Sequence, residues 1–148
     1  MVTSVGTEDR LDELVADLVK LDTAAIAAYD TAIERLSNAS YREKLREFRS
    51  DHDEHTQVLG VWLRDRDRTP PEGGGVKELL TTGKVAIAAL MGDEQILQAM
   101  KTNEDDTNTA YERAVEHSEA DGLRDTFAKN LEDERRHRAW IEATLALL

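Results

Sequence analysis

Six acidic and histidine residues form three pairs along this chain, and the two members of every pair are separated by the same number of positions. The pairs are Asp22 with Glu104, His52 with Glu134, and His55 with His137. We call this constant separation the repeat offset. Carboxylates and imidazoles in one cluster are ligands that suit iron, manganese or zinc. If the fold gathers these six side chains, metal binding is therefore the chemistry that they could do.

The composition excludes several kinds of chemistry and several classes of partner. The chain has 148 residues and no cysteine, so thiolate catalysis, disulfides and iron–sulfur clusters are excluded, and any metal must be bound through oxygen and nitrogen. Its net charge of -12 argues against nucleic acid and anionic membranes as partners, and no apolar stretch is long enough to span a bilayer. Small neutral or cationic partners remain. The N-terminal segment has no signal-peptide features, which predicts a cytoplasmic protein.

Four amphipathic stretches predict an all-α chain with a single domain over residues 1–148. The expected helices cover residues 7–36, 40–66, 93–118 and 121–148 approximately. We expect Ser40 and Glu43 to form a capping box at the start of the second helix. Pro70, Pro71 and the glycines at 73–75 mark a long connection over residues 67–92, between the second and third helices.

The lengths of the connections predict the topology. Short connections make residues 7–66 and 93–148 two antiparallel hairpins. The second helix would be about 40 Å long, and the connection over 67–92 can cross that distance, so the second and third long helices would run parallel. The repeat offset also relates Tyr29 to Tyr111, which indicates a duplicated hairpin and a bundle with approximate two-fold symmetry.

Helical phase indicates which polar residues face the core. Asp22 and Tyr29 continue a seven-residue series that begins at the apolar Val15, so Asp22 falls on the buried seam. The same extrapolation places the other paired residues inside the bundle: His52, His55, Glu104, Glu134 and His137. Residues 53 and 54 are expected to face water, and in the acidic run 104–106 only the first residue is expected inside.

Buried carboxylates need a compensating cation, because an unpaired one costs several kcal/mol. No Lys or Arg occupies the seam positions of these layers, so bound metal ions or protonated histidines must neutralise Asp22, Glu104 and Glu134. A buried network of acids and protonated histidines is thus the alternative to a metal site.

Four aromatic residues each have two possible interpretations, and the remaining histidine is assigned no function. Tyr29 and Tyr111 either pack as ordinary core or donate hydrogen bonds to the ligating carboxylates. Trp62 and Trp140 are expected in the core or in the contact of a homodimer. His117, near the end of the third long helix, receives no role.

The chain resembles the ferritin-like superfamily from about Leu11 to Leu148, in particular its small rubrerythrin-related bacterial branch of undefined function. That family carries a Glu on the first helix, Glu-x-x-His on the second, a Glu on the third and Glu-x-x-His on the fourth. The positions of this pattern are taken here by Asp22, His55, Glu104, Glu134 and His137. The departure is His52, which stands where the family has a bridging Glu.

The resemblance implies a ferritin-like four-helix bundle that binds two iron or manganese ions, with zinc as an occupant in a purified sample. Such a protein would oxidise ferrous iron or reduce O₂ or peroxide during oxidative stress, as a ferroxidase- or peroxidase-like di-iron oxidoreductase. Three arrangements stay open: His52 as a terminal ligand of a two-metal site, Asp51 as a fourth acid, or a single-metal site. The alternative function is a structural or partner-binding, stress-related bundle whose site is vestigial or holds one metal.

Overall fold

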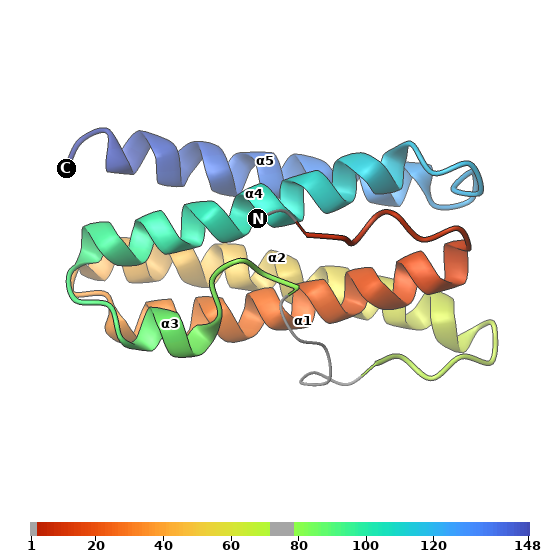
Figure 1. Cartoon of the computed structure of the whole chain (residues 1–148), viewed down its shortest axis with the longest axis horizontal. Coiled ribbons are helices and arrows are strands. Elements are labelled where there is room, and N and C mark those ends of the chain that lie inside the picture. Colours follow the sequence, from red (N-terminus) through yellow and green to blue (C-terminus); the bar gives the residue numbers. More distant parts are fainter. Residues whose placement is uncertain (1–2, 72–78) are drawn as a thin grey trace.

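The computed structural model describes residues 3–71 and 79–148, and within these ranges the chain forms five helices and no strand (Figure 1). The helices are α1 (Leu11–Arg35), α2 (Ala39–Arg64), α3 (Lys84–Ala88), α4 (Asp93–Val115) and α5 (Arg124–Leu145). The prediction of an all-helical chain is confirmed. The short helix α3 was not predicted, and the glycines at 73–75 lie outside the described residues.

The four long helices pack in a closed ring. Helix α1 packs along α2, and α4 packs along α5, while α1 also contacts α4 and α2 contacts α5. Each hairpin is antiparallel, and α2 and α4 run in the same direction from left to right in Figure 1. The small helix α3 lies against α1. This arrangement directs one face of every long helix towards a common interior, where Leu18, Leu45 and Phe127 are fully buried.

One predicted helix start and one predicted helix cap are wrong. Helix α1 begins at Leu11 rather than near Thr7, and the Leu11 amide donates a hydrogen bond to the carboxylate of Glu119 at 3.0 Å. At the start of α2, the predicted capping box of Ser40 and Glu43 does not form. Asn38 caps the helix instead, since its side-chain oxygen accepts from the amides of residues 40 and 41.

The turn between α4 and α5 also differs from the prediction. Helix α4 ends at Val115 instead of residue 118, and α5 begins at Arg124 instead of near residue 121. The guanidinium of Arg124 donates to the backbone oxygens of Val115 and His117. The contact with Val115 satisfies a carbonyl group at the end of α4, and the contact with His117 adds to the hydrogen bond that its carbonyl accepts from the Ala120 amide. The connection is therefore a few residues longer than predicted.

The connection that follows α2 is fastened to α4 by buried polar side chains. Asp106 accepts from the Thr81 amide at 2.6 Å, and Asn103 both accepts from and donates to the backbone of Thr82. Asp106 is therefore buried, which corrects the prediction that it faces water. Among the described residues, no helix has the length and apolar character needed to cross a membrane.

Candidate metal centre

All six paired acids and histidines lie in the interior of the bundle, each no more than 1% exposed. They come from the four long helices: Asp22 from α1, His52 and His55 from α2, Glu104 from α4, and Glu134 and His137 from α5. Residues three apart on a helix share a face, so α2 and α5 each contribute two side chains to the same space.

The six residues form two overlapping groups that could each hold a metal ion. One group is Asp22, His52, His55 and Glu134, and the other is His52, Glu104, Glu134 and His137. Within each group, one potential ligand atom per residue lies within 4.8 Å of the others. His52 and Glu134 belong to both groups and so stand at their junction.

Glu134 presents one carboxylate oxygen to each group. Its Oε1 lies 3.5 Å from His55 Nδ1, whereas its Oε2 lies 3.3 Å from His137 Nδ1. His52 also faces both groups, with Nδ1 2.7 Å from Asp22 Oδ1 and Nε2 3.6 Å from Glu104 Oε1. One oxygen of the shared carboxylate therefore faces each group.

The two tyrosines tie the acids of one hairpin to the other hairpin. The Tyr29 hydroxyl on α1 donates to Glu104 on α4, and the Tyr111 hydroxyl on α4 donates to Asp22 on α1 at 2.6 Å. Burial and the neighbouring carboxylates raise the pKa of both tyrosines well above the ordinary value. Each hydroxyl therefore keeps its proton and serves as a donor that fixes one carboxylate.

Two aspartates hold the outward nitrogens of the histidines, again across the hairpins. His55 Nε2 contacts Asp133 on α5 at 2.9 Å, and His137 Nε2 contacts Asp51 on α2 at 2.8 Å. Asp51, predicted as an additional metal ligand, thus lies on the far side of an imidazole from the cluster. Asp133 was missed, although the repeat offset that relates it to Asp51 was a signal for it.

Two polar residues of α4 complete the cluster and were also missed. Thr107 Oγ1 lies 3.2 Å from carboxylate oxygens of both Glu104 and Glu134. Asn108 Nδ2 donates to the backbone oxygens of the same two residues, at 2.7 and 3.1 Å. Both lie one turn after Glu104, on its own face of the helix, which was the available signal.

The charges of the cluster are balanced within the protein. Burial by itself lowers the pKa of His52, but Glu134, Asp22 and Glu104 outweigh burial and raise that pKa to about 10. The pKa of His55 and of His137 is raised in the same way, to about 9 and about 12. Against the cost of burial, the histidines lower the pKa of Asp22 to about 2. Without a metal, protonated imidazoles therefore neutralise Asp22 and Glu104, whereas burial and the neighbouring Glu104 raise the pKa of Glu134.

Three ligand atoms of the cluster nevertheless lack a hydrogen-bond partner in the described part of the chain. They are His52 Nε2, Glu134 Oε1 and His137 Nδ1, all fully buried. A buried polar atom without a partner is costly, and a cation contacting these atoms would satisfy them. The residues present thus fit a metal ion both in chemical type and in the atoms they leave unpaired.

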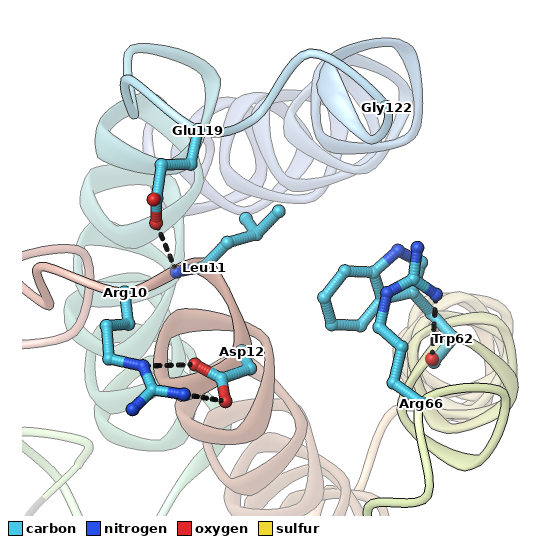
Figure 2. A pocket seen from close by; sticks show the side chains of 7 residues that line it. All are labelled: Arg10, Leu11, Asp12, Trp62, Arg66, Glu119 and Gly122. Carbon is cyan, nitrogen blue, oxygen red and sulfur yellow. Dashed lines mark hydrogen bonds and ion pairs between the residues drawn. The ribbon is translucent and has the colours of Figure 1, made fainter.

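A separate hollow lies where α1 begins and α2 ends (Figure 2). Arg10 and Asp12 form a bidentate ion pair at its edge, and Arg66 stacks on Trp62 at 3.8 Å. None of the six cluster residues lines this hollow. The charged side chains of the hollow all take part in such contacts, since Glu119 accepts from the Leu11 amide and Arg66 donates to the Trp62 backbone oxygen.

A helical bundle with a buried carboxylate and imidazole cluster is thus the class of protein that the fold and site define. Residues 11–117 match a family model described as a domain of unknown function, DUF2383, and the chain belongs to this family. No curated protein matches the chain.

The fold is similar to the crystal structure of a conserved hypothetical protein, rv2844, from Mycobacterium tuberculosis, with a TM-score of 0.77. The sequences are 18% identical, and the match covers 93% of this chain and 92% of that chain. At this identity the similarity concerns the fold alone. Neither comparison names the ferritin-like superfamily, so that assignment stays a prediction.

Proposed function

We propose that this protein is a ferritin-like protein that binds two divalent metal ions, iron or manganese, in the buried cluster. The observation that carries the proposal is Glu134, whose two oxygens face two different sets of ligand atoms. The shared direction of α2 and α4, with a long connection between them, supports the ferritin-like assignment.

The ligands divide between two positions. Asp22 and His55 would hold one ion, Glu104 and His137 would hold the other, and Glu134 would contact both. A neutral imidazole offers one lone pair, so His52 would serve a single ion through one of its nitrogens. Three carboxylates and three imidazoles suit iron or manganese, and they also accept zinc.

A pair of ferrous ions in this position would supply two electrons for the reduction of O₂ or peroxide. The chain's own residues hold the ligands in place for that chemistry. Tyr29 and Tyr111 donate to terminal carboxylates, and Asp51 and Asp133 fix the ring orientation of the histidines. The complete burial of the cluster excludes bulk water and large substrates.

Metal analysis of protein purified without chelators tests the proposal. We expect close to two equivalents of iron or manganese per chain in the wild type, and loss of most of that metal in Glu134→Gln. Asp53→Asn is the matched control, because Asp53 lies on α2 outside the cluster and contacts Gln57. One equivalent would favour a single-metal site, and none after incubation with ferrous or manganous ions would end the proposal.

A structural bundle with a vestigial site is the second candidate, and the charge balance of the cluster favours it. Protonated His52, His55 and His137 neutralise the acids with no ion bound. In that case, chelators and metal ions would both leave the thermal unfolding temperature unchanged. A rise in that temperature with Mn²⁺ would instead support the metal-binding function.

A further inference from the structure

A second surface hollow reaches the cluster at one histidine. It measures about 300 Å³ and lies between α2 and the first half of α5. Its lining includes Glu54, His55, Val58, Asp125, Lys129 and Asn130. His55 is only 1% exposed, so it forms part of the floor of this hollow. The hollow therefore ends at a residue of the cluster.

The floor connects to the ligand atoms through short polar contacts. His55 Nδ1 lies 3.2 Å from Asp22 Oδ1. Asn130, the second polar residue of the floor, donates to the Tyr111 hydroxyl at 3.4 Å, and that hydroxyl donates to Asp22. A movement of the His55 or Asn130 side chain would thus open the hollow directly to one of the two proposed ion positions.

The approximate two-fold symmetry provides an internal comparison for this hollow. The repeat offset relates Asn130 to Phe48, and Val58 to Trp140. The Phe48 ring stacks on His137 with centroids 4.3 Å apart, and Trp140 packs edge-on against Phe48 at 5.7 Å. The approach to His137 is therefore filled by aromatic rings where the approach to His55 is lined by small or polar side chains.

We propose that this hollow is the entrance through which divalent cations reach the buried cluster, an inference that rests on the proposed metal-binding function. Glu54 and Asp125 lie on its lining, and the net charge of -12 attracts cations to the molecule as a whole. Lys129 is paired with Asp133 at 2.7 Å, which reduces its repulsion of an approaching cation. In this proposal the aromatic rings block the approach to His137, and ions enter through the polar hollow beside His55.

Substitutions that copy the aromatic side onto the open side test the proposal. Val58 is 45% exposed, so Val58→Trp should fold normally, and adding Asn130→Phe completes the copy. We expect Mn²⁺ uptake by metal-free protein to slow by about tenfold or more in the double variant, because binding then requires a conformational opening. The amount of Mn²⁺ bound at equilibrium should stay at the wild-type value in Val58→Trp, which keeps the contact between Asn130 and the Tyr111 hydroxyl. Uptake is followed by stopped flow with a fluorescent indicator of free Mn²⁺.

Val61→Trp is the matched control, because Val61 lies on the same helix, is 52% exposed and does not line the hollow. It should leave the uptake rate unchanged. A charge reversal, Glu54→Lys with Asp125→Lys, should slow uptake on the order of tenfold at low salt, and the difference should shrink at high salt.

The outcomes separate the entrance from the metal site itself. Wild-type protein that binds no Mn²⁺ at equilibrium would overturn the proposed function and the entrance with it. Wild-type protein that binds Mn²⁺, combined with wild-type uptake rates in Val58→Trp, the double variant and the charge reversal, would overturn the entrance alone. Slower uptake in these variants but not in Val61→Trp, with unchanged equilibrium binding in Val58→Trp, supports the entrance.

Discussion

The two hairpins, α1 with α2 and α4 with α5, contribute to the cluster in nearly the same way. At positions related by the repeat offset, both supply an acid, a tyrosine, a histidine and an outer aspartate. The hydrogen bonds are exchanged between the hairpins: each tyrosine donates to the acid of the other hairpin, and each outer aspartate holds the other's histidine. Each hairpin therefore supplies hydrogen-bond partners for an acid and a histidine of the other.

The hairpins also differ at positions related by the repeat offset, and two of these differences concern charge and access. His52 on α2 corresponds to Glu134 on α5, which leaves three carboxylates and three imidazoles at the centre. Phe48 on α2 corresponds to Asn130 on α5, which fills one approach with an aromatic ring and leaves the other polar. A symmetric backbone can therefore carry an asymmetric charge and asymmetric access through a few substitutions.

We expect the largest effect on stability from a substitution that removes the difference in charge between the two hairpins. In His52→Glu, a buried carboxylate replaces an imidazole whose pKa is raised to about 10 and which carries a proton in the metal-free protein. Leaving buried acids without their cation should lower the free energy of unfolding of metal-free protein by about 3–5 kcal/mol. Saturating Mn²⁺ should restore more stability in this variant than in the wild type, because the new acid is an additional ligand. Urea denaturation with and without Mn²⁺ measures both effects.

The matched control for that prediction is Asp53→Glu, next to His52 on α2 but outside the cluster. It should change the unfolding free energy by about 0.5 kcal/mol or less, as surface substitutions usually do. If metal-free His52→Glu were as stable as this control, the imidazole would not be the compensating cation.

Removing the exchanged tyrosine contacts should have the next largest effect. Tyr29→Phe and Tyr111→Phe each delete a donor to a buried carboxylate, and hydrogen bonds to charged groups contribute about 1.5–3 kcal/mol. If the hairpins are equivalent, the two losses in unfolding free energy should agree. Tyr41→Phe is the control, because Tyr41 packs against Trp140 instead of the cluster acids. A loss in only one variant would show that one hairpin dominates.

The outer aspartates should contribute less to stability, because both are partly exposed. Asp133→Asn removes the charge beside His55, and Asp51→Asn removes the charge beside His137. We expect each to lower the unfolding free energy by about 0.5–1.5 kcal/mol and to weaken Mn²⁺ binding by about 10–100-fold. Calorimetric titration measures the affinity. Wild-type affinity in both variants would mean that the histidines need no outer partner.

The sequence was most informative where a regular pattern repeats. Helical phase placed Asp22, His52 and Glu134 in the interior, and the structure brings them together, because an unbroken helix fixes the direction of each side chain from its neighbours. The repeat offset also related the tyrosines correctly across the hairpins. It could not reveal that their hydrogen bonds are exchanged, since this depends on how the hairpins dock.

The errors occurred where contacts distant in sequence decide the local structure. Asp106 looks like part of an exposed acidic run, but it is buried because the connection after α2 passes over it and donates the Thr81 amide. At the start of α1, the Leu11 amide donates to Glu119, which is 108 positions away in the sequence. Neither of these contacts leaves a periodic signal. Asp133 was missed although the repeat offset relates it to Asp51, which had been singled out.

The smallest effect is expected outside the two hairpins, in the segment that precedes α1. Residues 3–10 pack against α4, where Arg113 donates to the backbone of Thr3 and Val5. Within this segment, burial raises the pKa of Glu8 to about 7, and the neighbouring Asp17 contributes to the rise from the ordinary value of 4.5. The folded protein thus binds this proton more tightly than the unfolded chain does.

The stability contributed by this proton is fully present below about pH 4.5 and is lost as the pH rises through about 7. Because Glu8 is partly exposed, solvent screening keeps the change small. Glu8→Gln should be as stable as the wild type at pH 4.5 and slightly more stable at pH 8, as measured by urea denaturation at both pH values. If the stability of Glu8→Gln changes with pH as that of the wild type does, the pH dependence comes from the buried histidines. If Glu8→Gln is more stable than the wild type only at the higher pH, part of the pH dependence of stability arises outside the two hairpins and their symmetric site.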